Sequence, residues 1–174
     1  MPGLELTSVQ ILRRHADPDK VVHMYTHILA GLDGSPQAPW VLRHAADLAA
    51  RTGAVLHLCR AVSVPVGVPF DAWMLTGNEL TARLLSYGAE ELQALAHDFH
   101  PSFTPIAWGQ HYCRFGSPGQ VIVDLAVEIQ ANLIVVGSHG YGILDRIIGT
   151  TAARIVNNAH CSVLVVRARA PVPS

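Results

Sequence analysis

Glycines and small hydroxyl residues gather in two short segments near the carboxyl end of the chain. The segment Gly137–Gly142 (GSHGYG) follows an apolar run, Leu133–Val136, and a second segment is Gly149–Thr151 (GTT). Glycine lets the backbone approach an anion closely, and free N–H groups at a helix start supply donors and partial positive charge. A strand, a glycine loop and a helix start together form one kind of phosphate site. We therefore predict a nucleotide site at the carboxyl end of this strand.

The same residues also have purely structural interpretations. Glycines after a strand often serve only to permit positive φ, and Thr150 and Thr151 can be ordinary N-caps, a role compatible with phosphate contact. His139 can touch a phosphate or be exposed, and Arg146 can hold a phosphate with its fork of donors or cover the surface. No carboxylate partner for His139 is evident, which argues against a catalytic role.

Composition excludes several classes of protein. The chain has 174 residues, half of them hydrophobic, which fits one domain with a sizeable core. Its net charge of -1 gives no basic surplus for nucleic acid. No apolar stretch approaches the roughly 20 residues of a membrane-spanning helix, and the start lacks the apolar core of a secretory signal. Three cysteines far apart fit reduced thiols, so we expect a cytoplasmic protein without membrane or nucleic-acid partners.

The single lysine of the chain is Lys20, far from the glycine segments. A Walker-type phosphate loop needs a lysine after its glycines, and a pyridoxal Schiff base needs one too, so both classes are excluded. His111 and Cys113 share a face of a predicted strand, but no further ligands stand at metal-binding spacing. We therefore predict no metal site built from protein side chains.

Apolar runs and helical periodicity alternate along the chain. The predicted strands are Thr26–Leu32, Ala54–Val62, Ile106–Phe115, Leu133–Val136 and Val163–Arg167, and the predicted helices are Ala38–Thr52, Asn78–Phe99, Gln120–Gln130 and a short piece after Gly149. This alternation predicts a single doubly wound α/β domain, a five-stranded parallel sheet with helices on both faces. We expect it to span residues 24–168, after a flexible extension (1–23, with Met24 as the natural start) and before a short tail (169–174).

Two further segments are expected to face a ligand. Ser63–Gly77 is rich in Pro and Gly yet carries Trp73 and Met74, which predicts a loop that orders over a bound nucleotide. Ligands of doubly wound sheets bind at the carboxyl ends of strands where the winding reverses. Asp33 ends the first predicted strand at that crevice, where it can contact a ligand or cap an Asx turn.

Three stretches together resemble the universal stress protein family of nucleotide-binding α/β proteins: THILAGLDGS, FGSPGQVIVDLAVEIQANLIVVGSHG and GTTAARIVNNAHCSVLVVR. The ATP-binding branch of that family carries Gly-x-x-Gly, usually nine residues, then Gly-Ser or Gly-Thr. Here Gly137-x-x-Gly140 is followed by eight residues and then Gly149-Thr150, a shorter spacing that also occurs in the family. Asn132 stands where the family commonly has aspartate.

The resemblance implies a Rossmann-like fold of the adenine nucleotide alpha hydrolase type that binds ATP, or AMP or ADP, with Mg²⁺ carried by the nucleotide. It places Asp33 beside the adenosine and the backbone of Ala61 against the adenine. It also implies a homodimer through the last strand, Val163, Leu164, Val165 and Val166. The resulting candidate ligand-binding residues are Gly31, Asp33, Ala61, Gly137, Ser138, His139, Gly140, Arg146, Gly149, Thr150 and Thr151.

We thus expect a stress-response or signalling protein that acts through ligand-dependent conformation or partner choice, with no catalytic residue assigned. One alternative is a slow ATP hydrolase or phosphotransferase on the same fold, although no general base is placed by a motif. The other alternative is a structural dimer module with an empty crevice, but the glycines argue against it.

Overall fold

Strands and helices alternate throughout the chain in the computed structural model, which describes residues 24–63, 70–99, 105–138 and 149–167, with the side chains of the second helix described from Asn78 onward. The elements are β1 (His27–Gly31), α1 (Ala38–Thr52), β2 (Val55–Val62), α2 (Phe70–Asp98), β3 (Ala107–Phe115), α3 (Pro118–Glu128), β4 (Leu133–Gly137), α4 (Thr150–Asn158) and β5 (Ser162–Val166). The predicted α/β organisation is confirmed.

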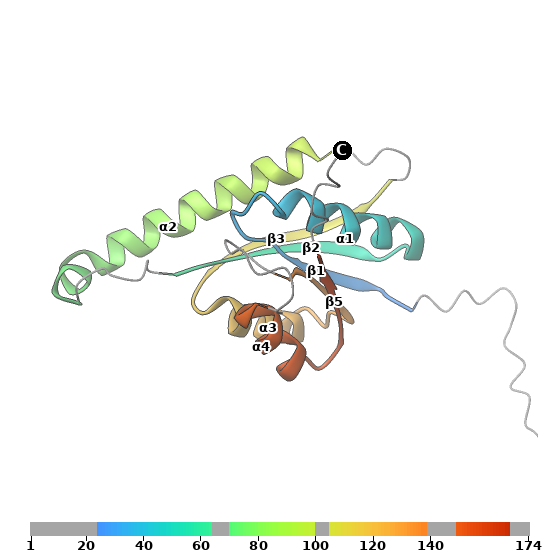
Figure 1. Ribbon diagram of the computed structural model, residues 1–174. Helices are drawn as coiled ribbons and strands as arrows, with labels where there is room; N and C mark the ends of the chain where they lie inside the picture. The colour runs from blue at the N-terminus through green and yellow to red at the C-terminus, as the bar shows by residue number, and fades with distance from the viewer. Residues whose placement is uncertain (1–23, 64–69, 100–104, 139–148, 168–174) are drawn as a thin grey trace, which may run out of the picture.

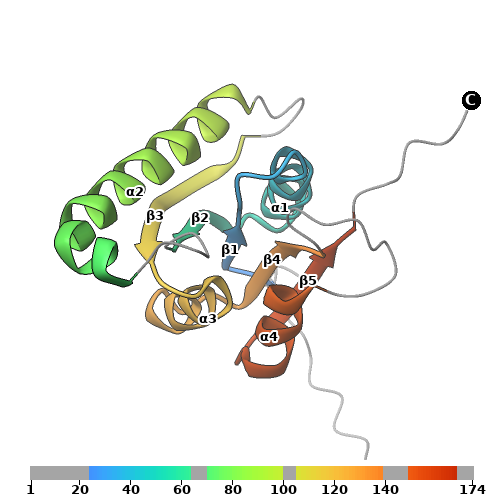
Figure 2. The ribbon, with the colours of Figure 1, turned by 60° about the vertical axis from the view of Figure 1, so that its left-hand side comes forward.

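All five strands are parallel and stand in the order β3-β2-β1-β4-β5 (Figure 1; Figure 2 labels all five strands). The first strand, β1, lies in the middle of the sheet. The chain continues outward on one side of β1 as β2 and β3, and then crosses to the other side of β1, where it forms β4 and β5. The winding therefore reverses between β1 and β4. This is the doubly wound topology that the sequence predicts, and every strand ends at the same edge of the sheet.

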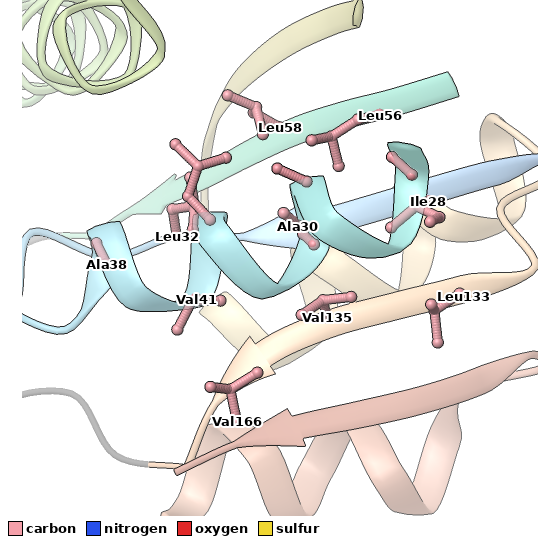
Figure 3. Close-up of a cluster of buried hydrophobic side chains, with 14 of the residues drawn as sticks. Ile28, Ala30, Leu32, Ala38, Val41, Leu56, Leu58, Leu133, Val135 and Val166 are labelled. Carbon is pink, nitrogen blue, oxygen red and sulfur yellow. The ribbon is translucent and has the colours of Figure 1, made fainter. Parts of the chain in front are cut away.

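Helices cover both faces of the sheet: α1 and α2 lie on one side, and α3 and α4 on the other (Figure 2). Alternate strand residues enter two separate cores. Ile28 and Val135 pack under α1, as Figure 3 shows, whereas Leu29 and Ile134 pack against α3 and α4. A parallel sheet buried on both faces needs apolar residues at successive positions, which explains the unbroken apolar runs of β1 and β4.

One predicted element is wrong in its extent. The segment Ser63–Gly77 was expected to be a loop, but α2 begins at Phe70, so Phe70–Gly77 forms its first turns. Residues 64–69 and the Trp73 side chain lie outside the described residues, so the prediction that this segment covers a nucleotide stays a prediction. The prolines of this segment end at Pro69, and the eight residues after it carry only Gly77 as a helix-weakening residue.

A histidine pair joins β1, β2 and β3 on the α3 side of the sheet. The buried His57 ring accepts a hydrogen bond at Nδ1 from the Gln110 backbone N–H, at 3.2 Å. This assigns the proton of neutral His57 to Nε2, which lies 3.3 Å from Nδ1 of His27 and donates to it. A Cβ on Gly109 would come within 2.5 Å of the His57 ring, so glycine is needed there. Burial, and then the neighbouring His27, lower the pKa of His57.

This arrangement predicts a loss of stability in acid. Folded His57 resists protonation, because a proton on Nδ1 would face the Gln110 N–H. The unfolded chain takes up that proton as the pH falls through the ordinary pKa of 6.5. The free energy of unfolding should therefore fall between pH 7.5 and pH 5.5. His57→Asn keeps an acceptor near the Nδ1 position but does not titrate, so it should lose less stability in the same interval.

Urea unfolding at the two pH values measures the difference between these proteins. Burial also lowers the pKa of His111, which contributes equally to the acid-induced loss of stability in wild type and in His57→Asn. An equal acid-induced loss in wild type and His57→Asn would show that His57 is not the group responsible.

Candidate functional site

A cavity of about 330 Å³ lies at the carboxyl ends of β2, β1 and β4, over the point where the winding reverses. Its lining comes from the ends of these three strands and from the connections and helix starts that follow β1, β3 and β4. The lining residues are Gly31, Leu32, Asp33, Ser35, Gln37, Ala38, Val41, Ala61, Pro118, Ile122, Val136, Gly137, Ser138, Gly149, Thr150, Thr151 and Ala152. The volume is at the lower end of the range of about 300–1,000 Å³ that is usual for small-molecule sites.

Eight of the eleven candidate residues from the sequence line this one cavity: Gly31, Asp33, Ala61, Gly137, Ser138, Gly149, Thr150 and Thr151. The other three, His139, Gly140 and Arg146, lie outside the described residues. Four other residues of the cavity wall were not predicted from the sequence: Gln37, the N-cap of α1, Val41 of α1, and Pro118 and Ile122 of α3. The turn sequence before Pro118 follows a predicted strand, as Asp33 does, and could have pointed to it.

The amino-terminal ends of three helices converge on the cavity. Ala38 of α1, Pro118 of α3 and Thr150 of α4 all line it. The N-cap residues of these helices make no side-chain capping hydrogen bond, and none of the three first turns carries an acidic residue. Helix amino termini carry partial positive charge, so the cavity has the electrostatics of an anion site.

The α4 terminus offers backbone donors directly. Its N-cap is Gly149, which has no side chain, and the first helical bond runs from the Ala153 N–H to the Gly149 carbonyl. The N–H groups of Thr150, Thr151 and Ala152 precede that bond and have no acceptor within the helix. All three residues line the cavity.

Ser138 holds the two ends of the β4–α4 connection together. Its N–H donates to the Val166 carbonyl at 2.8 Å, and its carbonyl accepts from the Gly149 N–H, also at 2.8 Å. Ser138 is itself buried. Backbone hydrogen bonds therefore fix the start of α4 beside the end of β4.

Asp33 forms the Asx turn considered from the sequence. One carboxylate oxygen, Oδ1, accepts hydrogen bonds from the Ser35 N–H at 3.1 Å and from the Ser35 hydroxyl at 2.5 Å. The Ser35 hydroxyl in turn accepts from the Gln37 N–H at 3.3 Å, just before α1 begins. Asp33 is the only carboxylate among the described residues of the cavity wall. The turn thus fixes a negative group in the cavity wall just before the start of α1.

Gly31 allows α3 to close over the apolar side of the cavity. A Cβ at this position would lie 2.6 Å from Cδ1 of Ile122 and 2.9 Å from Cγ1 of Val136. Ile122 and Val136, with Val41 and Ala61, give the cavity an apolar wall beside its polar helix ends. A wall of this kind suits a flat, weakly polar ring, whereas the helix ends suit an anion.

Chemically reactive groups are few in the part of the chain that the structure describes. No cluster of three or more His, Cys, Asp or Glu side chains there could hold a metal ion. Burial raises the pKa of the Cys59 thiol, which lies behind the cavity on β2, to about 12, so this thiol is not a nucleophile. Within the same residues, no helix is long and apolar enough to cross a membrane.

The fold and the cavity define a doubly wound α/β domain with a ligand site at its switch point. Comparison with models of protein families identifies the family of this chain, because the model of the universal stress protein family matches residues 24–167. The chain therefore belongs to the universal stress protein family.

Individual relatives agree with this assignment. Universal stress protein A homolog 1 of Coxiella burnetii is 32% identical over 145 residues, covering 82% of this chain and 96% of its own. The solved structure of universal stress protein UspA from Lactobacillus plantarum is 25% identical, with a TM-score of 0.65 and coverage of 82% of this chain and 98% of its own. A universal stress protein solved in complex with cAMP has the same fold, with 24% identity, a TM-score of 0.53 and coverage of 82% and 97%.

The Asx turn yields a prediction about stability in the absence of ligand. Asp33→Ala removes the acceptor of two hydrogen bonds and should lower the free energy of unfolding by about 1–3 kcal/mol. Asp33→Asn keeps an acceptor oxygen and should cost less than about half of that. Chemical unfolding of the two variants beside wild type tests this expectation. If Asn were as damaging as Ala, the negative charge rather than the turn would be what stabilises the loop.

Proposed function

We propose that this protein binds an adenine nucleotide, ATP foremost, in the cavity over the β1–β4 switch point. The observation that carries the proposal is the convergence of three helix amino termini, uncapped by side chains and without acidic residues, on one cavity that also has an apolar wall. A nucleotide combines the two chemistries that this site offers, an anionic phosphate chain and a flat base.

Each part of the cavity has a role in this proposal. The phosphates bind the N–H groups at the start of α4 that have no acceptor within the helix, where Gly149 permits close approach. His139, Gly140 and Arg146 lie outside the described residues and join this proposed phosphate site from the sequence alone. The base lies along the wall of Ala61 and Ile122, with Asp33 near the ribose. Mg²⁺ would arrive with the phosphates rather than on protein ligands. The cAMP complex of a protein with this fold makes cyclic nucleotides, with AMP and ADP, necessary comparison ligands.

The residues of the described cavity wall favour a sensing role over an enzymatic one. Asp33 is the one carboxylate of the described wall, and its Oδ1 is already engaged by Ser35, so it is poorly placed to activate water. We propose a cytoplasmic stress-response protein whose bound nucleotide changes its conformation or partner choice. A slow ATP hydrolase would show Mg²⁺-dependent turnover, and a structural dimer module would bind no nucleotide.

A single backbone donor can be removed to test the phosphate site. Thr150 is the first residue of α4, where proline is well tolerated, and Gly149 before it has the extended conformation that precedes proline (φ -60, ψ 156). Thr150→Pro therefore deletes one N–H and should spare the helix. A hydrogen bond to a charged group is worth about 1.5–3 kcal/mol, so ATP should bind about ten- to a hundredfold more weakly.

The matched control is Thr150→Ala, which removes the hydroxyl and keeps the N–H. Titration calorimetry should find ATP affinity near wild type for Thr150→Ala, and adenosine affinity unchanged in both variants. Equal ATP affinity in Thr150→Pro and wild type, with the fold intact, would remove the start of α4 from the phosphate site.

We further propose that the protein is a homodimer through β5. This strand is at the edge of the sheet and pairs only with β4 among the described elements. Its residues Val163, Leu164 and Val165 are only half-buried in the single chain. An apolar edge with unpaired backbone groups favours pairing with a second copy across a two-fold axis.

Leu164→Glu places a charge in this proposed interface and should convert the dimer to a monomer at low micromolar concentration. Val127→Glu is the control, because Val127 is 55% exposed on α3 and its substitution adds the same charge away from β5. Analytical ultracentrifugation separates the two states. A monomeric wild type, or a dimer that survives Leu164→Glu, would contradict the β5 interface.

A further inference from the structure

Arg154 reaches from α4 to the start of α3. Its Nη1 lies 3.3 Å from the hydroxyl oxygen of Ser117, the N-cap residue of α3. Its aliphatic stem passes over Gly119, where an added Cβ would come within 2.8–3.1 Å of the Cβ, Cγ and Cδ atoms of Arg154. The glycine at position 119 thus makes room for this side chain, while the residue as a whole stays exposed.

Neither Arg154 nor Ser117 lines the cavity itself, but the guanidinium lies next to residues that do, a position that we call the rim of the cavity. Helical side chains lean toward the amino terminus of their helix, so Arg154 projects toward the turn that contains Thr150 and Thr151. Ser117, which its guanidinium touches, directly precedes Pro118. Because Pro118, Thr150 and Thr151 all line the cavity, the guanidinium bridges the two helix starts that border it.

The position of this charge is electrostatically unfavourable without an anion. A cation near a helix amino terminus is repelled by the partial positive charge there, and Arg154 stands near two such termini. In the part of the chain that the structure describes, Arg60, Arg83 and Arg114 each pair with a glutamate, and no ion pair of Arg154 is found. A neutral hydroxyl takes up only one of the five N–H donors of its guanidinium.

We propose that Arg154 binds the outer phosphates of the nucleotide and makes the site select ATP over AMP. This inference rests on the proposed nucleotide function. The guanidinium fork matches phosphate oxygens, and an anion at the rim would be held by the cation and by the helix starts together. Nucleosides and monophosphates, which do not extend to the rim, would bind without its help.

Two substitutions separate the charge from the packing. Arg154→Met keeps an aliphatic stem over Gly119 and removes the charge, whereas Arg154→Lys keeps the charge without the fork. Arg51→Met is the control, because it removes the same charge from the far end of α1, away from the cavity. Calorimetry with ATP, AMP and adenosine on the full chain, with thermal unfolding of each variant, measures the effect.

Arg154→Met should weaken ATP binding about tenfold or more and AMP and adenosine binding by less than about threefold, with Arg154→Lys intermediate and Arg51→Met like wild type. An unchanged ATP-to-AMP affinity ratio in Arg154→Met, beside a wild type that binds ATP, would overturn this inference alone. An equal loss for ATP and adenosine would also overturn it, since that pattern indicates disturbed α3–α4 packing. A wild type that binds no adenine nucleotide would instead overturn the proposed function.

Discussion

The reversal of winding between β1 and β4 is the constraint on which the rest of the structure depends. Because all strands run parallel, every helix that follows a strand begins at the same edge of the sheet. The helix after β1 leaves toward one face and the helix after β4 toward the other (Figure 2). The edge between them is left open, and the cavity occupies that opening.

The same topology supports the proposed anion site, whose described wall contains no lysine or arginine. The chain has one lysine, and it lies outside the described residues, so the cavity has no counterpart of a Walker lysine. Three helix amino termini stand in its place, and the first turns of those helices lack the acidic residues that would otherwise neutralise them. The exception is Asp33, which lies before α1 and accepts hydrogen bonds from Ser35 in the turn that precedes this helix.

Local patterns explain why much of this architecture could be predicted from the sequence. The apolar runs of β1 and β4 are evident in the sequence, and Gly137 and Gly149 mark the two ends of the β4–α4 connection by residue type alone. The start of α2 at Phe70 was missed, because a cluster of prolines and glycines just before it resembles a loop that continues further. Sequence reasoning also cannot place Ile122 against Gly31, since that contact depends on the crossover of the whole chain from β3 to β4.

The contact of Arg154 with a residue distant in the sequence also could not be predicted from the sequence. Its spacing from Thr150 indicates only that it lies one turn further along a helix, whereas its contact with Ser117 joins positions 37 residues apart. Gly119 likewise resembles a turn residue in the sequence, and its packing against the Arg154 stem becomes visible only in three dimensions.

We propose that the switch-point cavity holds a phosphate chain attached to a flat base. The most direct test is calorimetric titration of wild-type protein with adenosine, AMP, ADP and ATP at low and high salt. We expect affinity to rise along this series, and we expect added salt to weaken the binding of ATP more than that of adenosine, because helix ends and a guanidinium attract the phosphates. Equal affinity for adenosine and ATP, or no binding of either, would contradict it.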